Sequence, residues 1–366
     1  MLGALRPVDS ATVVTYPDEF AKKEIAELAE AAGYSVAELI TQKRLIRSEF
    51  GVGSGKALEL RDIVEQNHSK TLIVDEELTS SQVNNLSKAA NVRVIDRDRL
   101  ILDIFAKRAN TAEAKLQVQL AELNYELPRL KDAVRNSKTG ERAGFSGLGE
   151  LAIDVKFRAL KRQMVVVREK LAKVQASRGV QRSGRRRLGI PLVSLAGYTS
   201  SGKTTLFNRL AAEAKEVSPS LFTTLTTTTR TIELERSKNV LLSDTVGFVS
   251  RLPTYMVDSF KSTLEELSYA DAVLLLIDAS EDERSIEIKL SSCHAILDEL
   301  KVEPDRVLWL LNKVDLVKGS LNRIEDDLLK GRQTLRISAL RGDGLRKLKN
   351  ALVARLSETT HTPPRS

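Results

Sequence analysis

The chain has 366 residues, 42% hydrophobic and 29% charged, so it can bury a sizeable core and is not globally disordered. Cys293 is its single cysteine, which excludes an internal disulfide and fits a reducing compartment. The longest apolar run, residues 272–277, is far too short to cross a bilayer, and the N-terminus lacks the features of a secretion signal. We therefore expect a soluble protein of the cytoplasm, with no insertion into a membrane. We also expect a monomer.

The net charge of +8 lies entirely in the first half of the chain. Residues 1–189 contain 33 Lys and Arg against 25 Asp and Glu, whereas residues 190–366 contain 24 of each. This imbalance favours a polyanionic partner, such as nucleic acid, for the first half, although a solvated charged surface would give the same counts.

Residues 1–106 alternate short apolar runs with helical patterns. Strands are expected at 12–16, 72–74 and 92–95, and helices at 18–32 and 79–89, the latter with Thr79 as N-cap. The alternation predicts a small α/β domain with a largely parallel sheet.

A glycine-rich segment in this region, Gly51 to Lys56, resembles a phosphate loop but is one residue too short. Ala57 stands where such a loop needs Ser or Thr. We interpret the segment as a tight turn before a helix, or as a loop that contacts RNA.

Residues 107–187 carry two heptad patterns separated by a glycine-rich break at 140–149. The apolar positions are Leu116, Leu120, Leu123, Leu127, Leu130 and Val134, then Ile153, Phe157, Leu160, Met164, Val167, Leu171 and Val174. They predict a long antiparallel helical hairpin with arms of about 25 residues, kinked or broken at Pro128. Five arginines among residues 178–187 predict a basic linker after the hairpin.

Residues 188–358 form a second α/β pattern, followed by a polar tail at 359–366. Strands are expected at 191–196, 240–243, 273–277, 307–311 and 335–337. An eight-residue stretch after the first of these strands matches G-x-x-x-x-G-K-[ST]. It reads Gly197-Tyr198-Thr199-Ser200-Ser201-Gly202-Lys203-Thr204, and a helical pattern begins at Thr205.

Strand, glycine loop and helix together predict a phosphate loop, in which backbone amides and the helix N-terminus hold phosphates. We expect Lys203 to reach the β- and γ-phosphates and the Thr204 hydroxyl to ligate Mg²⁺. Asp244, at the end of the next strand, is expected to hold Mg²⁺ through water, and Gly247 to offer its amide to the γ-phosphate. A threonine from the preceding loop should complete the metal shell. The loop contains six candidates that the local sequence does not distinguish: Thr223, Thr224 and Thr226 to Thr229.

The base is predicted from Asn312-Lys313-Val314-Asp315, which follows the strand at 307–311. The Asp315 carboxylate can accept two hydrogen bonds from N1 and N2 of guanine, whereas adenine offers no such donor pair. Asn312 can reach N7, and the stem of Lys313 can lie along the base. After the last strand, Ser338-Ala339-Leu340 can place a backbone amide at guanine O6, so we expect GTP rather than ATP.

Phe248 follows Gly247, where many GTPases place a glutamine that positions the attacking water. Phenylalanine cannot do this. We expect hydrolysis either to be slow or to use a group from elsewhere. The alternative, that Phe248 merely packs, is compatible with this expectation.

The motifs together resemble the HflX family of translational GTPases. The segments that carry the resemblance are Gly197-Tyr198-Thr199, residues 222–230, Asp244 to Phe248 with Arg251-Leu252-Pro253, and, upstream, Gly53 to Lys56, Asp96-Arg97, Leu116 to Ala121 and Pro128-Arg129-Leu130. The resemblance implies an α/β fold class: a P-loop GTPase domain with a mostly parallel sheet, preceded by a small α/β domain and a long antiparallel helical hairpin. It also implies that residues 1–187 bind the large ribosomal subunit and its rRNA, in splitting or rescuing stalled ribosomes.

Within the family, the matching switch threonine is Thr224. Ser200 departs from the usual asparagine, a residue linked to potassium activation in related GTPases. The chain stops after the helix expected at 344–357, so it is more similar to the short archaeal members of the family.

The expected catalytic residues are Lys203, Thr224 and Gly247, and the expected Mg²⁺ ligands are Thr204, Thr224 and Asp244. The expected nucleotide contacts are Gly197, Tyr198, Thr199, Ser200, Ser201, Gly202, Lys203, Thr204, Thr205, Phe222, Thr224, Asp244, Gly247, Asn312, Lys313, Asp315, Ser338, Ala339 and Leu340.

Two other functions compete with a ribosome-bound GTPase. One is a GTP-gated scaffold that uses the hairpin to dock a protein. The other is an RNA remodeller with an ATP site at Gly51 to Lys56. Salt dependence separates the first from the ribosome hypothesis, because contacts to phosphate weaken steeply with salt.

Overall fold

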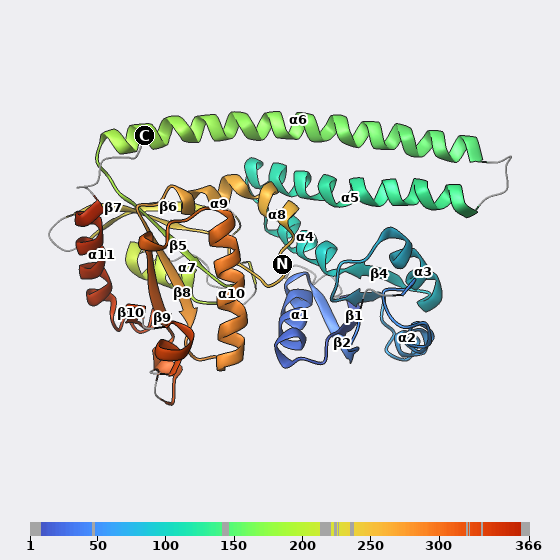
Figure 1. The fold of residues 1–366 in the computed structure, drawn as a ribbon, viewed down its shortest axis with the longest axis horizontal. Coiled ribbons are helices and arrows are strands. Elements are labelled where there is room, and N and C mark those ends of the chain that lie inside the picture. The colour runs from blue at the N-terminus through green and yellow to red at the C-terminus, as the bar shows by residue number, and fades with distance from the viewer. Residues whose placement is uncertain are drawn as a thin grey trace, which may run out of the picture. The chain divides into compact units, whose positions relative to one another are not determined.

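The computed structural model describes residues 9–45, 48–140, 146–212, 221–222, 225, 227–234, 238–319, 321, 323–330 and 332–359 (Figure 1). The chain divides into two compact units, Met1–Ala172 and Lys173–Ser366. Each contains a mostly parallel sheet with helices, which confirms the expected α/β class. The predicted boundaries at 106 and 187 stay a prediction.

The first unit contains a parallel sheet of four strands in the order β2-β1-β3-β4. The strands are β1 (Asp9–Thr15), β2 (Tyr34–Thr41), β3 (Thr71–Val74) and β4 (Arg93–Asp96). The helices are α1 (Glu19–Ala31), α2 (Ser54–Gln66), α3 (Ser80–Ala90), α4 (Arg97–Arg108), α5 (Ala112–Gly140) and α6 (Ser146–Arg187), the last of which continues into the second unit.

Strand β2 was not predicted from the sequence, because it lies at the sheet edge. Most of its eight residues are partly or fully exposed, and only Tyr34 and Ile40 are buried. An edge strand of this kind lacks the apolar run from which the other strands were predicted. Thr79 does cap α3, in a capping box with Gln82, as expected.

The glycine segment at 51–56 forms a turn that leads into α2, with Gly53 as its N-cap and Gly51 at φ 72°. The Lys56 ammonium lies 2.6 Å from Oε1 of Glu59, on the next turn of the same helix. This geometry agrees with a turn before a helix.

The point between β1 and β3, where strand order reverses, is filled by the protein's own charges. Arg97 donates to Asp75 and to Glu24, each at 2.7 Å, and all three side chains are at most 5% exposed. Ligands of open α/β sheets bind at such reversal points. The internal ion network therefore occupies the place that a nucleotide would take in this sheet.

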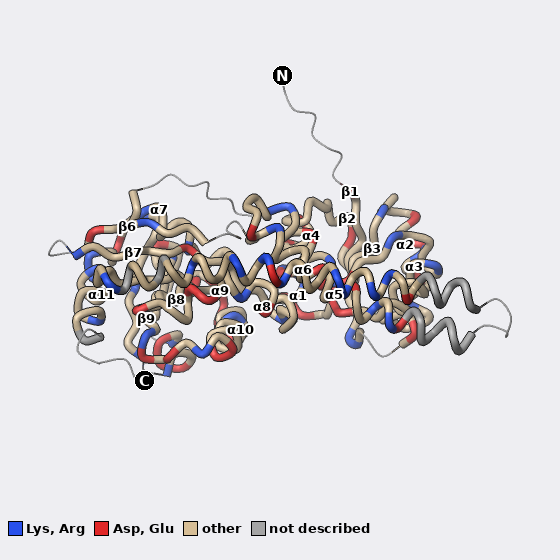
Figure 2. The backbone as a smooth tube through the Cα atoms, turned by 90° about the horizontal axis from the view of Figure 1, so that it is seen from above, with Lys and Arg blue, Asp and Glu red and all other residues tan. Residues whose placement is uncertain are grey.

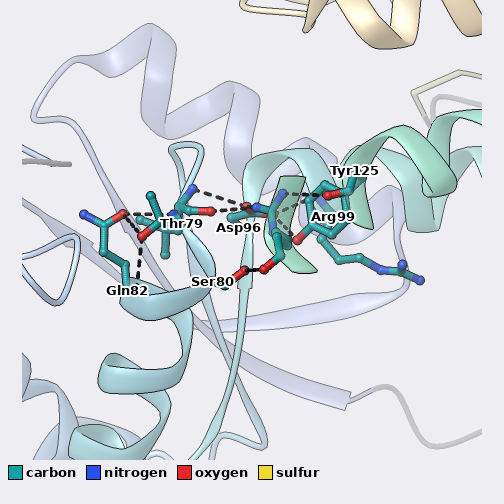
Figure 3. A network of polar contacts seen from close by, with 8 residues as sticks. Thr79, Ser80, Gln82, Asp96, Arg99 and Tyr125 are labelled. Atoms are coloured by element: carbon teal, nitrogen blue, oxygen red, sulfur yellow. Dashed lines mark hydrogen bonds and ion pairs between the residues drawn. The ribbon is translucent and has the colours of Figure 1, made fainter. Parts of the chain in front are cut away.

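Asp96, at the carboxyl end of β4, joins the sheet to the first arm of the hairpin (Figure 3). It accepts from the Arg99 amide at 2.9 Å and from the Tyr125 hydroxyl at 3.0 Å, and it pairs with Arg129. Arg129 also donates to the Leu78 carbonyl at 2.7 Å and stacks on the Tyr125 ring. Asp96 is fully buried, so this network fixes α5 against the sheet.

Helices α5 and α6 lie side by side (Figure 1), and their heptad positions pack against each other, as predicted for a hairpin. Their shared cluster contains Leu120, Leu123, Met164, Val167 and Leu171, with Leu116, Leu127 and Leu160 at its margin. Helix α5 continues through Pro128, so the break was wrong and the alternative, a kink, stays a prediction. The residues expected to form a basic linker, 178–187, are helical, because α6 extends as one helix of 42 residues to Arg187. Residues 141–145, at the turn, lie outside the described residues.

The second unit contains a six-stranded sheet in the order β10-β9-β8-β5-β7-β6, parallel except for β6. Its strands are β5 (Leu192–Gly197), β6 (Thr228–Glu233), β7 (Asn239–Asp244), β8 (Ala272–Asp278), β9 (Val307–Asn312) and β10 (Thr334–Arg336). Its helices are α7 (Lys203–Ala211), α8 (Thr254–Ser259), α9 (Lys261–Ser268), α10 (Glu283–Glu299) and α11 (Leu345–Thr359), with short helices η2 (Pro304–Arg306), η3 (Val314–Leu316) and η4 (Ile324–Leu328).

Strand β6 was not predicted, and it corrects the expected extent of the threonine-rich loop. Thr228 and Thr229 pair with Asp244 and Ser243 of β7, so neither lies in a loop. Only Ile232 of β6 is buried, which is why the segment shows no apolar pattern. None of the helices that the structure describes combines the length and the apolar character needed to cross a bilayer.

Candidate nucleotide-binding site

The parallel strands of the second sheet end at one edge, and the predicted site residues follow those ends. Gly197 ends β5, Asp244 ends β7 and Asn312 ends β9. Residues far apart in sequence therefore meet because the carboxyl ends of parallel strands lie together.

The loop from β5 to α7 has the backbone that a phosphate cradle requires. Gly197, Ser200 and Gly202 have φ angles of 141°, 61° and 97°. A Cβ on Gly197 would lie 2.5 Å from the Leu276 carbonyl oxygen, and one on Gly202 would collide with the Asn312 amide. Glycine is therefore required at both positions.

Lys203 begins α7 beneath this loop and is 7% exposed. Its ammonium donates to the carbonyl oxygens of Gly197 at 2.9 Å and Tyr198 at 2.6 Å. Burial lowers the pKa of Lys203 to about 8, while nearby Asp244 acts in the opposite direction. A buried cation at a helix N-terminus suits an anionic ligand.

Thr204 and Asp244 place two oxygen donors side by side. The Thr204 hydroxyl donates to Oδ2 of Asp244 at 3.1 Å, and Asp244 is fully buried at the end of β7. A hydroxyl and a carboxylate are the hard oxygen ligands that Mg²⁺ prefers, and the ion normally keeps waters and phosphate oxygens as well. The pair therefore fits Mg²⁺ although the described residues contain no cluster of three metal-ligating acids, cysteines or histidines.

Gly247 and Phe248 lie directly against the phosphate loop. A Cβ on Gly247 would lie 3.1 Å from the Lys203 ammonium and 3.0 Å from the Thr199 Cα. The Phe248 amide donates to the Gly197 carbonyl at 3.2 Å, and the Thr199 amide donates to the Phe248 carbonyl at 2.8 Å. The Phe248 side chain is 1% exposed, so it packs in the interior.

Asn312 connects the phosphate loop to the loop that follows β10. Its Nδ2 donates to the Ser201 carbonyl at 2.8 Å, and its Oδ1 accepts from the Ala339 amide at 2.9 Å. The side chain is 1% exposed. One residue thus fixes the distance between the two parts of the site.

Asp315 is held as an ionised acceptor at the end where a base would bind. A hydrogen bond with Ser338 is the main cause that lowers the pKa of Asp315, and Arg341 adds to it. Nε of Arg341 lies 3.6 Å from Oδ2 of Asp315. In the same loop, Ser338 and Ala339 are buried and Leu340 is 72% exposed.

Two residues beside the base-binding end were not predicted. Asp278, at the end of β8, forms an ion pair with the Lys313 ammonium at 2.5 Å. This contact holds the Lys313 side chain beside the base position. Arg341 is the other. An acid at the carboxyl end of a parallel strand is a signal that could have identified Asp278, whereas nothing in the sequence marks Arg341.

Most of the predicted site residues are brought together by the fold, and the remaining ones are accounted for as follows. Thr205 lies in the first turn of α7, and Phe222 is buried with φ 55°. Thr224, with Thr223 and Thr226, lies outside the described residues.

Three family models match consecutive parts of the chain. One described as GTP-binding GTPase N-terminal matches residues 20–106, one described as GTP-binding GTPase Middle Region matches 108–185, and one described as 50S ribosome-binding GTPase matches 192–313. The three matches cover both units.

Curated relatives and solved structures agree. GTPase HflX of Thermococcus kodakarensis is 42% identical over 301 residues, spanning 82% of this chain and 68% of the relative, and that of Escherichia coli is 35% identical over 352 residues, spanning 93% and 82%. The crystal structure of SsGBP with GDP has 28% identity and a TM-score of 0.55, covering 96% of this chain and 99% of that chain. A GTP-binding protein from Sulfolobus solfataricus with GDP has 26% identity and a TM-score of 0.51, with the same coverage. These relatives confirm the resemblance: the chain belongs to the HflX family of GTPases, and it binds and hydrolyses GTP.

Proposed function

We propose that this GTPase binds the large ribosomal subunit through residues 1–187 and acts there in splitting or rescuing ribosomes. In this proposal its nucleotide site uses Mg²⁺, held by Thr204, Thr224 and Asp244. The 3.1 Å contact between Thr204 and Asp244 supports the metal assignment. When bound, Mg²⁺ neutralises charge on the β- and γ-phosphates.

The other site residues have separate proposed tasks. Lys203 binds the phosphates, and Gly247 offers its amide to the γ-phosphate, since both lie where the phosphate loop meets the segment after β7. Asp315 binds N1 and N2 of guanine. The remaining contacts are those of the phosphate loop, Phe222, Asn312, Lys313 and the loop from Ser338 to Leu340.

The charge of α6 carries the ribosome proposal. Between residues 153 and 173 this helix exposes Lys156, Arg158, Lys161, Arg162, Arg168, Lys170 and Lys173. The same stretch holds only two acids, Asp154 and Glu169, and lysines and arginines recur along the helix (Figure 2). Such a surface fits the phosphate backbone of rRNA. One family model of this chain also describes a 50S ribosome-binding GTPase. Such a role would place the protein in the cytoplasm.

The scaffold alternative has less support. The heptad leucines that would form a docking surface, such as Leu120 and Leu123, are buried between α5 and α6. The ATP alternative is weaker still, because Lys56 pairs with Glu59 and an ion network fills the reversal point of the first sheet.

The test measures binding of the full chain to purified large subunits, with a non-hydrolysable GTP analogue, as salt rises from roughly 50 to 200 mM. Replacing Lys156, Arg162 and Arg168 by Gln should weaken binding. It should also make the slope of log affinity against log salt concentration shallower by about one for each phosphate that the variant no longer neutralises. The matched control replaces three exposed basic residues of the second unit by Gln and should bind like wild type. These residues are Lys301, Arg346 and Lys347. Binding of wild type that does not change with salt would contradict the proposal.

Stimulation of GTP hydrolysis by large subunits is the second measurement. We expect stimulation of wild type and its loss in the α6 variant, with basal hydrolysis retained. Absence of any stimulation at low salt would move the scaffold hypothesis to first place.

A further inference from the structure

Tyr198, the second residue of the phosphate loop, contacts the segment after β7 through both its backbone and its side chain. Its backbone lies beside Phe248 in a parallel bridge. Its phenol oxygen accepts a hydrogen bond from the Ser250 amide at 2.5 Å. Tyr198 is 4% exposed and Ser250 is 6% exposed, so water does not replace either partner easily.

The ring of Tyr198 is also held from behind by α10. The Lys289 ammonium lies 5.0 Å from the ring centroid and pairs with Glu281 at 2.5 Å. The cation–π contact with Lys289 and the hydrogen bond from the Ser250 amide thus hold the same side chain, which restricts its movement.

The segment from Gly247 to Ser250 is therefore attached to the phosphate loop at two points. The Phe248 backbone is attached by its hydrogen bonds with Gly197 and Thr199, and the Ser250 amide by the Tyr198 hydroxyl. Gly247 precedes both points and lies against Lys203. Because the Phe248 side chain is buried, the contribution of this segment to the γ-phosphate rests on where its backbone amides lie.

We propose that Tyr198 is a positioning residue for GTP hydrolysis, whose hydroxyl holds the segment from Gly247 to Ser250 closed on the phosphate loop. The inference rests on the proposed role of Gly247 at the γ-phosphate. GDP lacks that phosphate, so GDP binding does not depend on the closed segment. The hydroxyl therefore acts on GTP and on the rate of its hydrolysis, and not on nucleotide binding in general.

The experiment compares the full-length wild type, Tyr198→Phe and the control Tyr269→Phe, which removes the hydroxyl of a tyrosine that is 40% exposed. Three quantities are measured: the Kd of GDP, the Kd of a non-hydrolysable GTP analogue, and the single-turnover rate of hydrolysis at saturating GTP. For Tyr198→Phe we expect a fall in rate and in analogue affinity of about three- to tenfold, as for loss of one hydrogen bond, with the Kd of GDP within about twofold of wild type. The control should match wild type in all three.

Hydrogen exchange supplies a measurement that does not depend on a variant. The Ser250 amide of wild type should be protected with the GTP analogue bound, and should exchange faster in Tyr198→Phe. An unprotected amide in wild type would overturn the proposal.

Two other results would also overturn it. One is an unchanged rate and an unchanged ratio of analogue to GDP affinity in Tyr198→Phe. The other is an equal loss of affinity for GDP and the analogue at the wild-type rate, which would show that Tyr198 only shapes the phosphate loop. Failure of the proposed role of Gly247 is distinguishable, because Tyr198→Phe would then speed exchange of the Ser250 amide while leaving the hydrolysis rate and the ratio of analogue to GDP affinity unchanged.

Discussion

Replacing Asn312 by Ala should disrupt the nucleotide site from its interior. The change removes the bonds to the Ser201 carbonyl at 2.8 Å and the Ala339 amide at 2.9 Å, and both partners are buried. A buried polar group that loses its partner costs about 1–3 kcal/mol, so the two together should lower the free energy of unfolding by about 2–4 kcal/mol. Affinity for GDP should fall at least about 30-fold, because the phosphate loop and the base loop lose their shared anchor.

The assay is urea unfolding followed by the fluorescence of Trp309, the single tryptophan, which is buried in β9 of the second unit. The control Asn239→Ala removes an exposed amide at the start of β7 and should change stability by less than about 0.5 kcal/mol. Asn312→Asp separates the two bonds, since it can still accept from Ala339 but turns a carboxylate oxygen toward the Ser201 carbonyl. Unfolding and GDP binding of Asn312→Ala that match the control would refute the reasoning.

Three further predictions concern the base, the pH dependence and the hairpin junction. Asp315→Asn should weaken GTP binding about 10- to 100-fold and favour xanthosine triphosphate, whose C2 carbonyl accepts a hydrogen bond from the new amide. A nucleotide competition assay measures this preference, and an unchanged preference for GTP would contradict the assignment of the base. Burial lowers the pKa of His294 below its ordinary 6.5, so the unfolded chain binds more protons and the second unit should lose stability as pH falls below 6.5. His294→Gln should reduce this dependence of the unfolding free energy on pH, measured by unfolding at several pH values across the range. An unchanged pH dependence would rule His294 out as its cause. Asp96→Ala leaves Arg129 without its buried carboxylate and should lower the free energy of unfolding of the first unit by about 3–5 kcal/mol, measured by thermal or urea unfolding. The control Asp132→Ala, on the helix that carries Arg129, should lower it little. Equal effects of the two variants would show that the junction is not stabilising.

The sequence by itself determined the chemistry of the site. A glycine loop before Lys203, an acid at the end of a strand and the Asn312-Lys313-Val314-Asp315 segment indicate a guanine nucleotide, because each residue type has one plausible task at that spacing. The heptad spacing likewise determined that two long helices pack together, since a repeated apolar position must be covered.

Tertiary structure decided the features that have no local signal. The edge strands β2 and β6 form because a neighbouring strand offers hydrogen bonds, although their own residues are largely exposed. Helix α6 continues to Arg187 where arginines and two glycines had favoured a linker. The contacts of Tyr198 with Ser250 and of Lys313 with Asp278 join residues more than 30 positions apart, so only the folded chain places them together. Local patterns encode what each segment buries, and the sheet decides which segment ends become neighbours.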